Sequence, residues 1–153
     1  CCPRGSAVTL YLDTSSLVKL YVAEPGSDVV RRLVKQATIV ATSAVAYPET
    51  RAALARRRRE RVLTAAAFTR ATRAFEDDWP RYLAVAVSAS ICRVAGDLAE
   101  RYRLRGYDAV HLASYLEIAR RAGISETQFS SFDERLNRAA RAAMRALARA
   151  GRR

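Results

Sequence analysis

Short β-prone runs alternate along this chain with longer segments whose apolar residues recur at helical spacing. Three runs are read as strands because β-branched and aromatic residues dominate them: 8–12, 38–42 and 128–132. A further apolar run, 83–87, is typical of either a strand or the buried start of a helix. The segments between these runs predict helices at 14–21, 27–35, 43–59, 64–79, 88–103, 107–123 and 134–150. This alternation predicts a three-layer α/β/α fold around a short central parallel sheet.

Pro48 complicates the helix expected after the second strand. Ser43 is a candidate N-cap for that helix, because its side chain can accept from a free backbone N–H. A proline inside a helix removes a backbone hydrogen bond and crowds the preceding turn. We therefore expect that the helix either begins at Pro48 or bends there.

The chain has 153 residues, which is enough for one domain with its own core. Half of the residues are apolar and 27% are charged, which argues against a disordered chain. No apolar run approaches the ~20 residues of a membrane span. The opening segment 1–6 is typical of a cleaved expression tag, so we expect the domain over 7–140 and a basic C-terminal helix extension and tail over 141–153. We expect a cytoplasmic protein, with Cys92 as a small core residue.

Positive charge is in large excess, with 27 Lys+Arg against 15 Asp+Glu and a formal net charge of +12. Such an excess favours a polyanionic partner. An arginine-rich composition inherited from a GC-rich genome would give the same number. Arg56–Arg59 are candidates for phosphate contacts, although a solvated helix end explains them equally well. Arg138, Arg141, Arg145 and Arg149 lie on one face of the last predicted helix, where they could contact RNA or an acidic segment of a protein partner, or form a surface with no partner.

The acidic residues are few, and four of them lie at informative places. Asp13 and Asp133 each follow a predicted strand directly, and the ligand site of an open parallel sheet lies at the carboxyl ends of its strands. Glu49 and Asp108 lie among apolar neighbours, where a carboxylate is costly to bury unless it is paired or binds a cation. Each has an ordinary alternative: a helix N-cap for Asp13 and Asp133, a first-turn acid for Asp108, and an arginine pair for Glu49.

Taken together, the four acids favour a shared cation. Ligands that are all oxygen atoms suit Mg²⁺ or Mn²⁺ rather than Zn²⁺. A bound divalent ion would reverse the charge that an acidic cluster presents to a phosphodiester, and it would acidify a water molecule. An acidic cluster within a basic surface is therefore the arrangement that a metal-dependent nuclease needs. The single histidine, His111, lies one helical turn after Asp108, and we interpret it as structural because a metal-bound water needs no added base.

Four short blocks occur in order along the chain: YLDTS at 11–15, ETRAAL at 49–54, GYDAVHLA at 106–113 and FSSFDERL at 129–136. Together they resemble the motif blocks of PIN-domain ribonucleases, and their order and the chain length resemble the VapC-type toxins of bacterial toxin–antitoxin pairs. The resemblance extends over residues 8–140.

The resemblance implies an Mg²⁺-dependent endoribonuclease, with Mn²⁺ as a substitute, on a PIN-like α/β/α fold. Asp13, Glu49 and Asp108 match the three principal acids of the family, and Asp133 matches a fourth, less uniform one. These four are the expected catalytic metal ligands. The family also places small hydroxyl residues beside the first acid to support it, and here these are Thr14 and Ser15.

The same resemblance implies partners for the chain. Its substrate would be RNA, it would form a homodimer, and a VapB-like antitoxin would hold it inactive by laying a tail into a groove near the acids. In this sequence the walls of that groove would be the helices that carry Leu17, Leu20 and Tyr21 and the helices near Leu54, Val62 and Phe68.

Three hypotheses follow for the function. The first is a metal-dependent endoribonuclease toxin that an antitoxin inhibits. The second is a non-catalytic PIN-like module that binds RNA without cleaving it, and the presence of all four acids argues against this. The third is a small α-helical DNA-binding regulator, which explains the charge but not the acids at strand ends.

Overall fold

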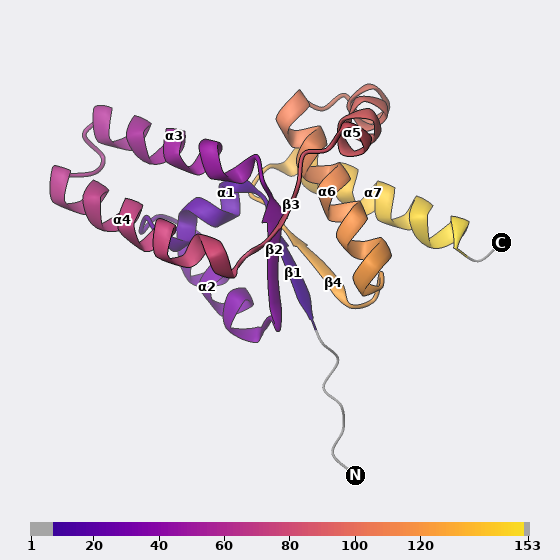
Figure 1. Cartoon of the computed structure of the whole chain (residues 1–153), viewed down its shortest axis with the longest axis horizontal. Helices are drawn as coiled ribbons and strands as arrows, with labels where there is room; N and C mark the ends of the chain where they lie inside the picture. The colour runs from indigo at the N-terminus through magenta and orange to yellow at the C-terminus, as the bar shows by residue number, and fades with distance from the viewer. Residues whose placement is uncertain (1–7, 152–153) are drawn as a thin grey trace, which may run out of the picture.

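The computed structural model describes residues 8–151 and has an α/β/α fold (Figure 1). Four strands, all parallel, form the central sheet in the order β3-β2-β1-β4. Their bounds are β1 Thr9–Leu12, β2 Ile39–Ser43, β3 Leu83–Val85 and β4 Thr127–Ser130. The predicted fold class is confirmed, and the ambiguous run at 83–87 contains a strand.

Helices cover both faces of the sheet, with α1 to α4 on one side and α5 to α7 on the other (Figure 1). In Figure 1 α3 and α4 extend away from the sheet side by side. The helical bounds are α1 Thr14–Leu17, the 3₁₀ turn η1 Val18–Leu20, α2 Ser27–Gln36, α3 Ala46–Arg59, α4 Ala65–Asp78, the 3₁₀ turn η2 Trp79–Arg81, α5 Ala89–Tyr102, α6 Gly106–Ala122 and α7 Glu134–Ala150.

Strand β1 is the centre of the core because it has a neighbour on each side and helices on both faces. All four of its residues are buried, as expected for a parallel strand covered twice. Leu10 and Leu12 pack against the layer of α1 to α4. Tyr11 points the other way and packs against α5, α6 and α7. The strand therefore fixes the position of the residue that follows it, Asp13.

Pro48 lies in the first turn of α3, which begins two residues before it, at Ala46. The helix therefore does not begin at Pro48, and the expectation that Ser43 is its N-cap was wrong. The N-cap is Val45, and Ser43 is the last residue of β2. The backbone N–H groups of a first turn have no partner within the helix, so a proline there removes no hydrogen bond.

Cys92 is exposed on α5, so its expected place in the core was wrong. The buried face of α5 is formed by Ile91, Ala95 and Leu98, which recur at helical spacing. Cys92 is one position out of phase with that face.

The C-terminal helix α7 runs without a break through residue 140, where the sequence analysis placed the end of the domain. Its apolar residues pack into the core and its four candidate arginines are exposed. The proposed tag segment 1–6 lies outside the described residues. Within residues 8–151, no helix has the length and apolar character that crossing a membrane requires.

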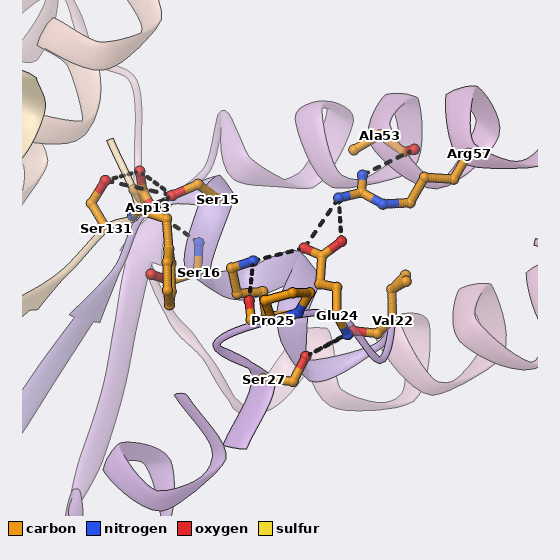
Figure 2. Close-up of polar contacts among 12 residues, drawn as sticks. Asp13, Ser15, Ser16, Val22, Glu24, Pro25, Ser27, Ala53, Arg57 and Ser131 are labelled. Atoms are coloured by element: carbon orange, nitrogen blue, oxygen red, sulfur yellow. Dashed lines mark hydrogen bonds and ion pairs between the residues drawn. The ribbon is translucent and has the colours of Figure 1, made fainter. Parts of the chain in front are cut away.

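A compact network of charges joins the segment before α2 to α3 (Figure 2). The carboxylate of Glu24 accepts from Arg57 at 2.9 and 3.2 Å and from the Lys19 ammonium at 3.0 Å. Lys19 also donates to the carbonyl of Pro25 at 2.9 Å. These side chains are largely shielded from solvent, and Arg57 therefore contributes to structure instead of being wholly available to a phosphate.

Gly26 lies under the aromatic ring of Phe132, where any other residue would be strained. Its φ is +93°, and a Cβ at this position would lie 2.4 Å from the ring. The Lys19 ammonium lies 4.4 Å from the centre of the same ring. The segment before α2 thus supports the loop between β4 and α7.

Replacing Glu24 with glutamine is expected to flatten the loss of stability in acid. Burial raises the pKa of Glu24, but the hydrogen bonds and charges of Arg57 and Lys19 outweigh burial and bring the pKa below its ordinary value of 4.5. A carboxyl whose pKa is lowered by folding stabilises the fold above its unfolded pKa, and this contribution is lost as pH falls through the folded pKa. We expect the free energy of unfolding to fall more steeply below about pH 4.5 in the wild type than in Glu24→Gln.

Urea titrations between about pH 3 and pH 7 would measure this difference. Asp28→Asn is the matched control, because Asp28 lies four positions after Glu24, in the first turn of α2, and its side chain is 97% exposed. Parallel stability curves for the wild type and Glu24→Gln would show that the network does not contribute to acid stability.

Candidate active site

Asp13 follows β1 directly and is almost fully enclosed, with 4% of its surface exposed. Its carboxylate accepts from the Ser15 hydroxyl at 2.7 and 2.9 Å and from the Ser131 hydroxyl at 2.6 Å (Figure 2). It also accepts from the backbone N–H of Ser16 at 2.9 Å and so caps α1. The capping role weighed for Asp13 is therefore present, and it accounts for one of several donors.

The surroundings of Asp13 act on its pKa in opposite directions. Burial raises the pKa, because a charged carboxylate is poorly solvated there. Hydrogen bonds from Ser131, Ser15 and the Ser16 N–H lower it, but burial dominates and the net pKa is raised. An acid in this state gains from a nearby cation, which would stabilise its charged form.

Glu49 is brought to the same edge of the sheet by α3. Its Oε2 accepts from the Thr14 hydroxyl at 2.5 Å and lies 2.8 Å from Nε2 of His111. Burial raises the pKa of Glu49, but the hydrogen bonds from His111 and Thr14 outweigh it and the net pKa is lowered. Glu49 is therefore ionised at neutral pH. Thr14, the residue after Asp13, links the two acids.

His111 is buried and holds Glu49 in place from α6. Because an ionised carboxylate only accepts, Nε2 of His111 carries the proton that faces Glu49. In the neutral ring Nδ1 is then an acceptor, and the Tyr11 hydroxyl lies 3.0 Å from it. His111 therefore connects the central strand to Glu49. It was interpreted as a structural residue, and here it also positions one acid of the site.

Asp108 and Asp133 lie on either side of an arginine. Asp108 is in the first turn of α6, and its Oδ2 accepts from Nε of Arg105 at 2.9 Å. Oδ2 of Asp133 lies 3.9 Å from Nη2 of the same arginine. Asp133 also caps α7 by accepting from the N–H of Leu136 at 2.9 Å. Asp108 is thus a first-turn acid and Asp133 is an N-cap, as the ordinary alternatives predicted. The two acids also share a cationic partner, Arg105.

The structure brings all four predicted acids to the carboxyl edge of the sheet, but each carboxylate has its own hydrogen-bonding partners. Within residues 8–151, no three Asp, Glu, His or Cys side chains lie close enough together to hold one ion. The donor chemistry fits a hard divalent cation, because every acid offers oxygen atoms alone. The position of Arg105 shows that a cation is attracted between two of them.

Three members of the site were not predicted from the sequence: Ser131, Tyr11 and Arg105. Ser131 comes from the loop after β4, and Tyr11 reaches the site only through its hydrogen bond to His111. Arg105 offers the one local signal, because it precedes Asp108 by a helical turn and such pairs approach each other. Of the two predicted supporting residues, Ser15 contacts Asp13 and Thr14 contacts Glu49.

The sequence motifs predicted an α/β/α fold whose parallel sheet carries acids at its carboxyl edge, and the structure has this arrangement. Residues 10–142 match the PIN domain family, and the chain belongs to that family. It is 39% identical over 134 residues to ribonuclease VapC45 and to ribonuclease VapC49, both of Mycobacterium tuberculosis, over 88% of this chain and 90% of each relative. Ribonuclease VapC46 of the same organism is 31% identical over 138 residues, which are 86% of this chain and 90% of that protein. The expected VapC-type PIN-domain protein is confirmed.

Proposed function

We propose that this chain is an Mg²⁺-dependent endoribonuclease toxin of the VapC type, with Mn²⁺ as a substitute metal. The observation that carries the proposal is the set of four acids, Asp13, Glu49, Asp108 and Asp133, at the carboxyl edge of the sheet in a chain of net charge +12. The names of the relatives, which are ribonucleases, support the same activity. RNA is the proposed substrate, and the cytoplasm is the proposed place of action.

These four acids would hold the metal. The carboxylates of Asp13 and Glu49 are already oriented by several hydrogen bonds. When bound, the ion would activate a water for attack on the phosphodiester and offset the negative charge that develops there. The chain itself supplies orientation. Ser15 and Ser131 fix the Asp13 carboxylate, while Thr14 and His111 keep Glu49 ionised and aimed at the same edge.

Inhibition by a VapB-like antitoxin is part of the proposal. A cavity of 420 Å³ lies between η1 and α4, and among its lining residues are Leu20, Tyr21 and Val62. Leu17 and Leu54 are fully buried, so the helices that carry them would contribute other residues to its walls. The cavity supports the proposal because its lining is mainly apolar, which suits an apolar segment of an antitoxin.

A homodimer is also proposed. Three large apolar side chains, Ile39, Leu83 and Val87, are exposed near the outer strand β3. Their exposure supports an interface there, because exposed apolar side chains that lie together commonly mark a contact with another protein.

Removal of divalent metal is expected to abolish RNA cleavage. The purified chain would be incubated with labelled structured RNA in Mg²⁺, in Mn²⁺ and in excess EDTA, and products would be resolved on a gel. We expect cleavage in both metals, none in EDTA, and recovery when metal is added back, because the acids alone repel phosphate. Cleavage that persists in EDTA would contradict a metal-dependent mechanism.

The same assay separates the second hypothesis, a non-catalytic RNA-binding module. RNA that is bound but stays intact in every metal would favour that module over the nuclease. The four acids together favour the nuclease, because a module that only binds RNA has no use for a carboxylate cluster facing phosphate.

A further inference from the structure

Arg105 is an exposed arginine that pairs with Asp108 and approaches Asp133. It precedes α6 as the N-cap residue, and 78% of its side chain is exposed. Its Nε bonds to Asp108 at 2.9 Å, and its Nη2 lies 3.9 Å from Asp133. The hydrogen bond and charge of Asp108, followed by the charges of Asp133 and Glu49, raise the pKa of Arg105. One guanidinium thus pairs with two of the four acids.

A divalent ion and this guanidinium need the same atoms. Arg105 uses Oδ2 of Asp108 and approaches Oδ2 of Asp133, which are oxygen atoms that a bound cation would take. The side chain of Arg105 is 78% exposed, so solvent weakens its pairing with Asp108 and metal binding displaces it at low cost.

We propose that Arg105 is an RNA-binding residue of the active site: Asp108 and Asp133 hold its guanidinium until a divalent ion binds them, and the released guanidinium then contacts a phosphate of the RNA. The proposal rests on the proposed ribonuclease function. Its physical reason is that a planar guanidinium bonds phosphate oxygens in pairs, and that a phosphate brought to the metal comes within reach of the same side chain. Arg105 would bind and position the substrate without taking part in proton transfer.

The test compares Arg105→Gln with Arg121→Gln. Arg121 is the matched control, because it lies at the other end of the same helix, is 77% exposed and pairs with Glu117 at 2.6 Å. The two arginines are separated by about 24 Å along the helix axis. Both variants lose one positive charge and one exposed pair within α6. Circular dichroism and thermal unfolding would show that both variants fold.

Two measurements on the full chain decide the proposal. The first is the affinity for Mn²⁺ without RNA, by isothermal titration calorimetry, where loss of the competing guanidinium should tighten binding about two- to fivefold in Arg105→Gln. The second is the cleavage rate in Mn²⁺ as a function of RNA concentration. The KM should rise about tenfold in Arg105→Gln, while kcat changes much less. Arg105→Lys should recover part of the KM, and Arg121→Gln should match the wild type in both measurements.

Each result decides the matter. Unchanged KM in Arg105→Gln would overturn the proposal, and tighter Mn²⁺ binding with unchanged KM would reduce Arg105 to a counter-ion for the acids. If the wild type cleaves no RNA in any metal, the proposed ribonuclease function fails instead. The affinity for intact RNA in Mn²⁺ would then replace KM, and equal affinities of Arg105→Gln and Arg121→Gln would overturn the RNA contact as well.

Discussion

Replacing Asp13 with asparagine is expected to lower RNA cleavage on the order of 10³-fold while leaving the chain folded. Asp13 is the most deeply buried of the four acids and comes from the central strand. Asparagine has nearly the same shape, and its carbonyl can still accept from the Ser16 N–H to cap α1. The negative charge that would hold a divalent ion is lost.

The same substitution is expected not to reduce stability. Burial raises the pKa of Asp13, so its charged form is less favourable in the folded chain than in the unfolded chain. Neutral asparagine removes this cost, and the temperature of unfolding should be equal to or higher than that of the wild type. Loss of activity with retained or increased stability is the signature of a residue kept for function.

Initial rates of RNA cleavage in Mn²⁺ and thermal unfolding at neutral pH would measure the two effects. Asp97→Asn is the control, because Asp97 is an exposed acid on α5 and its replacement removes the same charge. A rate close to that of the wild type in Asp13→Asn would exclude Asp13 as a metal ligand. A variant that fails to fold would instead assign Asp13 a structural role.

Replacing Phe75 with alanine is expected to destabilise the fold by about 3–5 kcal/mol. Phe75 on α4 is fully buried, and its ring lies 5.4–5.5 Å from the rings of Tyr21, Tyr47 and Trp79. Removing it would leave a cavity where α1, α2, α3 and α4 meet the sheet. A loss of this size is a large part of the roughly 5–15 kcal/mol that stabilises a typical domain.

Urea unfolding monitored by circular dichroism would give the free energy of unfolding of each variant. Val62→Ala is the control, because Val62 is 64% exposed and its replacement should cost less than about 0.5 kcal/mol. Phe75→Leu should recover much of the loss by filling part of the space. A cost below about 1 kcal/mol for Phe75→Ala would mean that the surrounding aromatic rings close over the cavity.

The fold was largely predictable because the strands and helices have strong local signals. The run that forms β1 is short, β-branched and followed by helix-capping residues, and all of these cues agree. The local sequence predicted less well where exactly a helix begins and which of its residues face the core. The sequence does not show that Pro48 falls in the first turn of α3, where a proline is tolerated, or that Cys92 faces outward from α5.

The site was predictable in its acids but not in its supporting contacts. The position of Asp13 after a strand and the motif around Asp108 were both visible in the sequence. The side chains that orient each acid and shift its pKa come from distant segments. His111, for example, contacts Glu49 although the two are 62 positions apart. Such contacts are made by the topology of the sheet, and no local pattern encodes them.

The strand order determines when the acidic site can form during synthesis on the ribosome. Strand β1 is made first, but one of its two neighbours, β4, lies near the end of the chain, and Ser131, which holds Asp13, follows 118 positions later. A chain still emerging from the ribosome therefore has an incomplete acid cluster until nearly all of it has been synthesised. We therefore expect the proposed nuclease to stay inactive while the message that encodes it is still being read.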